Sequence, residues 1–265
     1  EKEIIMETRT LKDKTIIGFK EGNHTYEIVQ PNGLIHVPSS VTTIMKPVFS
    51  DFGMAAAAGR KNLRETLIDS MDYEQTYKWN KTSFTKYLKE ASRDAVGVWT
   101  ASSARGSEIH DFLELYAKGL DPQFSKDSHI KMLQSNMLDW YKTKVQETLS
   151  VEKLIYSKEP LYAGKYDLEA VVEGYGRCLV DYKSGSASAL VFSEKWAIQL
   201  AGYMHAIMQE DGGNPFGRLI VHVNRDTGLV TERYYSAKTY QRDVCVWLNI
   251  CNIHQFIKDY KQEWK

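Results

Sequence analysis

The spacing of apolar residues along the chain changes near Ser150. Before that point, apolar residues recur mostly with the period of about 3.6 that an amphipathic helix requires. This spacing predicts helices over residues 82–89, 103–118 and 126–147. The first part of the chain is therefore expected to be mainly helical.

Residues 15–45 depart from this helical pattern. The apolar run IIGF, the alternation in HTYEIV and the turn residue Gly33 predict a small β-hairpin. The stretch VPSSVTTIM, residues 37–45, then begins a helix. We expect residues 1–100 to form an N-terminal elaboration made of this hairpin and several helices.

Short apolar runs bounded by turn residues follow Ser150 and are typical of strands. The strands are expected at residues 154–162, 166–172, 178–182, 219–223 and 229–234. Helices are expected at residues 194–209 and 237–261. The order of these elements predicts an α/β fold, with a mixed central sheet flanked by helices. At 265 residues the chain is expected to form a single domain, in which residues 101–265 are the core.

Composition restricts the classes of function. Hydrophobic residues make up 43% and charged residues 26% of the chain, as in ordinary globular proteins. Basic and acidic residues number 34 each, so the chain has no overall positive charge that would attract a polyanion from a distance. Any nucleic-acid site must therefore be local.

Cysteine usage and hydropathy bear on the compartment. The three cysteines, Cys178, Cys245 and Cys251, are scattered without a CxxC pair. This argues against a disulfide framework, a zinc knuckle or a four-cysteine iron–sulfur cluster, and favours a reducing compartment. The sequence contains no run of about 18 apolar residues, so we expect no membrane partner. The segment EKEIIMETRT lacks the layout of a signal peptide, although the chain starts without Met and an upstream targeting segment stays open.

The stretch GKYDLEAVVEGYGRCLVDYKSG, residues 164–185, sets charged residues among apolar ones. A hairpin with residues 174–176 as its loop would pair Asp167 with Lys183. Because strand side chains alternate between faces, Asp167, Asp181 and Lys183 would then share one face. They could form an ordinary cross-strand ion pair or a catalytic cluster, and this pattern alone leaves both interpretations open.

The expected helix over residues 194–209 carries a polar stripe. Lys195, Gln199 and Tyr203 follow one another at intervals of four residues, opposite an apolar stripe. A stripe of this kind could face water or lie across the acidic cluster, since the helix follows the DYK strand directly.

Together these motifs resemble the PD-(D/E)XK nuclease superfamily, and specifically its RecB-like exonuclease branch. The shared motifs, in chain order, are Gly106-x-x-x-His110, Glu159 before the next motif, Gly164-x-x-Asp167, Asp181-Tyr182-Lys183 and Gln199-x-x-x-Tyr203. The stretch VPSSVTTIM is also similar to a segment of phage-encoded and mitochondrial genome maintenance exonucleases. The resemblance covers most of the chain and implies a restriction-endonuclease-like core.

The resemblance implies a site for Mg²⁺ or Mn²⁺. The expected ligands are Asp167, Asp181, the Tyr182 carbonyl and His110, and the expected catalytic residues are Asp167, Asp181, Lys183, Gln199 and Tyr203. Carboxylate and carbonyl oxygens suit Mg²⁺, and imidazole suits Mn²⁺ better. Glu159 and Glu114 are additional candidates, the latter as a partner that orients His110. No iron–sulfur cluster is expected, because the branch members that carry one need four cysteines.

Candidate DNA contacts lie mostly in the N-terminal part. In residues 73–90 lysines alternate with aromatic residues, a composition that can stack bases and follow phosphates but equally suits an ordinary amphipathic helix. The candidate residues are Ser39, Ser40, Thr42, Lys78, Trp79, Lys81, Arg105 and Lys195.

The expected function is a divalent-metal-dependent DNA exonuclease that hydrolyses phosphodiester bonds from single- or double-stranded DNA ends. The alternatives are a catalytically inactive nucleic-acid-binding module of the same fold and a site-specific endonuclease. Such enzymes act in DNA recombination and repair, so a single-strand-binding or annealing protein is a candidate partner. The expected location is the cytoplasm of a bacterial or phage-infected cell, with the mitochondrial matrix as the alternative.

Overall fold

A computed structural model describes residues 6–49, 106–185 and 194–263 of the chain. The chain divides into two compact units. The first combines Glu1–Phe49 with His110–Lys265, and the second is Ser50–Ile109, almost all of which lies outside the described residues. The N-terminal strands therefore belong to the same unit as the expected core, and the unit boundaries along the chain follow Phe49 and Ile109. Within the described ranges, no helix is long and apolar enough to cross a membrane.

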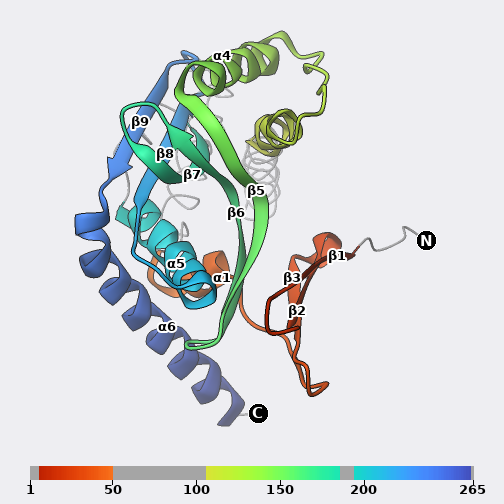
Figure 1. Ribbon diagram of the computed structural model, residues 1–265, viewed down its shortest axis with the longest axis vertical. Coiled ribbons are helices and arrows are strands. Elements are labelled where there is room, and N and C mark those ends of the chain that lie inside the picture. Colours follow the sequence, from red (N-terminus) through yellow and green to blue (C-terminus); the bar gives the residue numbers. More distant parts are fainter. Residues whose placement is uncertain (1–5, 50–105, 186–193, 264–265) are drawn as a thin grey trace, which may run out of the picture. The chain divides into compact units, whose positions relative to one another are not determined.

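A five-stranded sheet forms the centre of the first unit (Figure 1). Its strands, in spatial order, are β5 (Val145–Ser157), β6 (Tyr162–Val172), β7 (Gly176–Gly185), β8 (Gly217–Asn224) and β9 (Val230–Tyr235). Neighbouring strands are antiparallel except β7 and β8, which run parallel and are connected through helix α5 (Glu194–Asp211). The mixed sheet with flanking helices confirms the predicted α/β class.

Helices cover both faces of this sheet. Asp181 accepts a hydrogen bond from Gln199 of α5, whereas the ring of the next residue, Tyr182, contacts Trp140 of α4 (Ser128–Lys144). Consecutive strand residues point to opposite faces, so α5 and α4 lie on opposite sides of the sheet.

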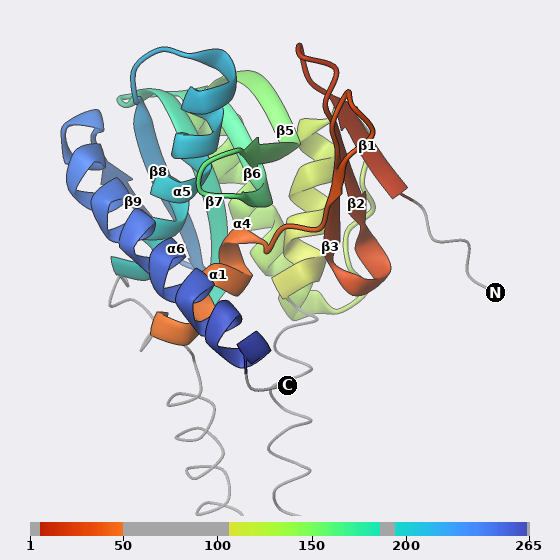
Figure 2. The same cartoon turned by 90° about the horizontal axis from the view of Figure 1, so that it is seen from below.

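Two further helices pack behind α5. They are α1 (Val41–Phe49) and α6 (Tyr240–Glu263), the second preceded by the short helix η3 (Ala237–Thr239) (Figure 2). A Cβ atom on Gly202 of α5 would lie 2.8 Å from the buried Trp247 ring of α6, so glycine allows the two helices to approach closely. The fully buried Arg218 of β8 binds Asp243 of α6 at 2.9 Å, which gives the buried guanidinium a charged partner.

A second sheet of four antiparallel strands lies against the extended ends of β5 and β6. Its strands are β1 (Met6–Thr10), β2 (Ile16–Lys20), β3 (Thr25–Val29) and β4 (Ile35–His36), with the short helix η1 (Glu21–Asn23) between β2 and β3. Ile17, Phe19 and Ile28 form a buried cluster with Leu154 and Tyr156 of β5. The N-terminal sheet is therefore anchored by a small hydrophobic core of its own.

The expected elements agree with the structure except around β5 and at the N-terminus, where the expected small hairpin is part of a four-stranded sheet that also includes β1. The helix expected over residues 126–147 ends at Lys144, and β5 begins at Val145. The strand expected over residues 154–162 is divided by a turn, because Pro160 has no N–H to donate to a sheet. Residues 106–117 are helical, close to the expected range of 103–118. The helix expected over residues 82–89 lies outside the described residues.

The register of the β6–β7 hairpin differs from the expected one. Val172 pairs with Gly176 and Leu168 with Val180, so residues 173–175 form the loop and Asp167 does not pair with Lys183. The observed pairing is shifted by two residues from the expected one. A shift by an even number keeps every side chain on the face where it was expected. The next position after Leu168 and Val180 would set Asp167 opposite Asp181, but the ladder ends before it.

Candidate active site

The candidate site lies where β6 and β7 separate. Their ladder ends at the pair Leu168 and Val180, so the backbone N–H of Tyr182 has no backbone acceptor on β6. It donates instead to Asp167 Oδ2 over 2.7 Å. The carboxylate thus takes the place of a backbone acceptor, which holds Asp167 at the fork between the two strands.

Asp181 is held from two sides. Its side chain is buried, and Oδ1 accepts a hydrogen bond of 3.2 Å from Nε2 of Gln199. Lys183 Nζ lies 2.5 Å from Asp181 Oδ2 and forms an ion pair with it. The geometry of this contact does not meet the criteria for a hydrogen bond. The nearby ammonium group offsets the cost of burying the carboxylate.

The polar stripe of α5 faces this cluster rather than water. Gln199 and Tyr203 are both buried, and the Gln199 Nε2 that contacts Asp181 lies 3.1 Å from the Tyr203 hydroxyl. The Tyr203 ring packs on Gly164, where a Cβ atom would lie 2.8 Å from Cε1 of that ring. The first residue of the GxxD motif therefore has to be glycine, because a larger residue would clash with the tyrosine ring of the QxxxY motif.

His110 joins the cluster from the helix over residues 106–117. Its Nδ1 lies 3.5 Å from Asp167 Oδ2, and its ring meets the Tyr182 ring edge-on. Burial and the Lys183 charge lower the pKa of His110, against opposing effects of Asp181 and the Tyr182 backbone. A neutral imidazole is the form that can bind a metal ion.

Glu114, the candidate partner of His110, forms an ion pair with Lys118, which directly follows the end of this helix.

Asp167 has a raised pKa because it is buried beside another acid. Desolvation, followed by repulsion from Asp181, raises the pKa of Asp167 to about 7. A buried carboxyl group whose charged form is disfavoured is typical of functional sites, because a bound cation can reverse the effect.

Glu152 is a further acidic residue that the sequence interpretation did not include. It lies on β5 between the residues that pair with Tyr166 and Leu168, which places it across from Asp167. Burial and then Asp167 raise the pKa of Glu152 to about 7. Its φ of 48° is in the left-handed region, which is rare for a residue with a side chain and often marks functional sites.

Glu159, in contrast, lies in the exposed turn between β5 and β6. Its backbone carbonyl accepts a hydrogen bond of 2.6 Å from Gln209. Glu159 is thus not among the residues around Asp167. Glu152, which also precedes the GxxD motif, is the glutamate that lies close to Asp167. The sequence carried one signal for Glu152, an acidic residue within the apolar run SVEKLIY, but the expected helix and strand left it in the connection between them.

The candidate DNA contacts of the described residues lie near the start of α1 and of α5. The Ser40 hydroxyl accepts a hydrogen bond from the Thr43 N–H and so caps α1. Ser39 Oγ lies 3.0 Å from His254 Nε2, and Thr42 is exposed. Lys195 is half-buried in the first turn of α5. The other candidates, Lys78, Trp79, Lys81 and Arg105, lie outside the described residues.

The donor atoms of the cluster suit a divalent cation. In the described part of the chain, no three His, Cys, Asp or Glu side chains form a ready-made metal site. The chemistry nevertheless fits, because Asp167 and Asp181 supply carboxylate oxygens and His110 a neutral imidazole. The Tyr182 carbonyl points to the same side of β7 as the N–H that contacts Asp167, which adds a fourth donor.

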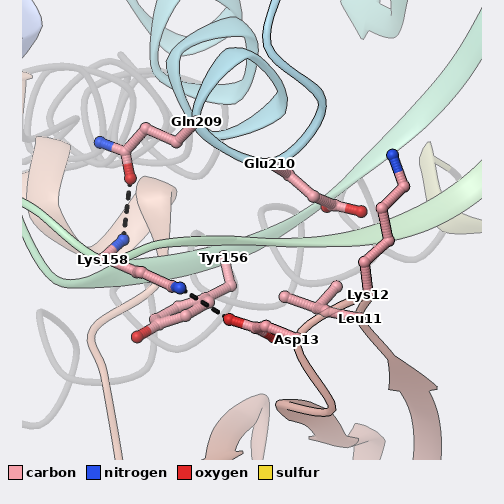
Figure 3. A pocket seen from close by; sticks show the side chains of 7 residues that line it. All are labelled: Leu11, Lys12, Asp13, Tyr156, Lys158, Gln209 and Glu210. Atoms are coloured by element: carbon pink, nitrogen blue, oxygen red, sulfur yellow. Dashed lines mark hydrogen bonds and ion pairs between the residues drawn. The ribbon is translucent and has the colours of Figure 1, made fainter.

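A hollow of about 210 Å³ contains none of these residues. It is lined by Leu11, Lys12, Asp13, Tyr156, Lys158, Gln209 and Glu210 (Figure 3). Lys158 donates to Asp13 over 2.7 Å across it, so these two charges neutralise each other. The hollow lies between the N-terminal sheet and the end of α5 and is not the candidate active site.

Comparisons with known proteins add little. No protein-family model matches the chain, and neither does any curated protein. A solved structure titled "Crystal structure of SSO0001" is similar at 13% sequence identity, over 77% of this chain and 86% of that one, with a TM-score of 0.32. A likeness this weak carries no argument about fold or function.

Proposed function

We propose that this protein is a divalent-metal-dependent DNA exonuclease of the PD-(D/E)XK type. The observation that supports the proposal is the convergence of Asp167, Asp181 and Lys183 at the fork of β6 and β7, with His110 beside them. An ordinary structural ion pair explains Asp181 and Lys183. It does not explain why, besides burial, Asp181 raises the pKa of Asp167 and Asp167 raises the pKa of Glu152.

The proposed metal ion would be held by Asp167, Asp181 and the Tyr182 carbonyl, with His110 as a further ligand. A bound Mg²⁺ or Mn²⁺ neutralises phosphate charge and lowers the pKa of a water molecule. The protein's own groups supply position and charge. Gln199 orients Asp181 through its 3.2 Å hydrogen bond, and Tyr203 in turn contacts Gln199. The Lys183 ammonium group can offset negative charge that develops on the phosphate.

Digestion of end-labelled linear DNA tests the proposal. Single- and double-stranded linear substrates and a closed circle would be incubated with Mg²⁺, Mn²⁺ or EDTA. We expect the linear DNA to be lost from its ends only with metal, and the circle to persist. Cutting of the circle would favour a site-specific endonuclease, and metal-dependent DNA binding without cleavage would favour an inactive binding module.

A further inference from the structure

Lys165 of β6 occupies an unusual position two residues before Asp167. Its Nζ lies 2.8 Å from Glu152 Oε2 of β5 and 3.7 Å from Glu7 Oε2 of β1. The same ammonium group lies 5.3 Å from the centre of the Phe19 ring of β2. One lysine thus connects the strand of the candidate acids with two strands of the N-terminal sheet.

The Glu152 side chain needs a fixed position. It is only 13% exposed and lies across β5 and β6 from Asp167. Two nearby carboxylates repel each other unless a cation lies close to them, and both can bind the same metal ion. Lys165 supplies the positive charge that Glu152 contacts directly.

We propose that Lys165 is a positioning residue that keeps Glu152 apart from the metal ligands, and that Glu7 and Phe19 hold Lys165 in place for this task. The N-terminal sheet is then part of the active site, and the acids are arranged for catalysis only when it is docked. This inference rests on the proposed metal-dependent nuclease function. The competing explanation is that the Lys165 contacts serve only to attach the N-terminal sheet.

The two explanations differ in metal affinity. If Lys165 only attaches the sheet, its loss lowers stability without changing how the folded protein binds Mn²⁺. If Lys165 restrains Glu152, its removal takes a positive charge away from the acids and frees a third carboxylate. The folded protein should then bind Mn²⁺ more tightly but cleave more slowly, because Glu152 competes with Asp167 for the ion.

The experiment compares Lys165→Met with wild type by calorimetric titration of Mn²⁺, by kcat on linear DNA and by thermal unfolding. Lys153→Met is a matched control, because the Lys153 side chain is 22% exposed against 23% for Lys165 and faces Asp211 at 3.8 Å instead of the site. We expect Lys165→Met to lower both the Kd for Mn²⁺ and kcat by about tenfold, and Lys153→Met to change neither.

Two further variants test the role of Glu152. Lys165→Arg keeps the charge and should restore wild-type behaviour. Glu152→Gln combined with Lys165→Met removes both charges and should recover most of the kcat lost in Lys165→Met alone. If Lys165→Met fails to fold, Glu7→Gln takes its place and should shift both constants in the same direction by a smaller factor.

The outcomes separate this inference from the proposed function. A Lys165→Met protein whose Kd for Mn²⁺ equals or exceeds that of wild type overturns the positioning role, as does a double variant with no recovery. A wild type that neither binds Mn²⁺ nor cleaves DNA overturns the proposed function itself. A wild type that binds Mn²⁺ without cleaving DNA still allows the role of Lys165 to be decided from the Kd values.

Discussion

The backbone N–H of Tyr182 and the carboxylate of Asp167 form a hydrogen bond of 2.7 Å where two strands part. A main-chain donor that would otherwise be left unpaired thus fixes the candidate metal ligand. Because N–H and C=O of one strand residue point to the same side, the bond also directs the Tyr182 carbonyl toward the cluster. The separation of β6 from β7 therefore positions two candidate metal ligands, the Asp167 carboxylate and the Tyr182 carbonyl.

The first prediction concerns Asp181. Asp181→Asn should reduce DNA cleavage by at least about a hundredfold, because it removes a charged ligand from the metal site. Asp139→Asn, on the exposed side of α4, is the control and should cleave at the wild-type rate. Circular dichroism would establish that both variants are folded. Substantial cleavage by folded Asp181→Asn would contradict the proposed function.

His110 provides the second prediction. His110→Ala should weaken Mn²⁺ binding by about ten- to a hundredfold, as loss of a ligand or of its orienting group usually does. Excess Mn²⁺ should restore part of the activity. Calorimetric titration would measure the Kd, with His129→Ala on the exposed start of α4 as control. Equal Kd values for the two variants would remove His110 from the metal site.

The third prediction concerns pH and the metal-free protein. The pKa of Asp167 is about 7 in the folded protein against 3.8 for the ordinary group. Between these values the folded state binds more protons than the unfolded state, so the free energy of unfolding falls as pH rises. The melting temperature in EDTA should therefore fall between about pH 5 and pH 8, and Mn²⁺ should oppose the fall.

Asp167→Asn is the test of this assignment. The variant cannot ionise at residue 167, so its melting temperature in EDTA should depend less on pH than that of wild type. Differential scanning calorimetry across the pH range would measure both proteins. Identical pH profiles would mean that Asp167 does not carry the effect.

The fourth prediction concerns Gly164. Gly164→Ala should lower the free energy of unfolding by about 1–3 kcal/mol, because the new methyl group would lie 2.8 Å from Cε1 of the Tyr203 ring. Gly22→Ala is the control, since nothing lies within 4 Å of a Cβ atom there. Urea denaturation would measure both. Adding Tyr203→Leu to Gly164→Ala should relieve part of the loss, and a fully additive double variant would contradict the clash.

Much of the candidate site follows from local sequence patterns. The four-residue spacing of Gln199 and Tyr203 places both on one face of a helix, and alternation places Asp181 and Lys183 on one face of a strand. These relations depend only on helix and strand geometry, so they hold although the hairpin register differs from the expected one by two. The α/β class follows in the same way from the order of short apolar runs and longer periodic ones.

Other features were decided only by tertiary structure. Glu152 and Glu159 both precede the GxxD motif, and only the course of β5 shows which of them lies across from Asp167. In the sequence, Lys165 is not distinguished from other lysines in strands. Only the packing of β1 and β2 brings Glu7 and Phe19 beside it. The physical reason is that local patterns set which face a side chain occupies, whereas partners distant in sequence depend on where the chain bends and which strands meet. Those choices are made by the packing of the whole core, and no short stretch of sequence contains them.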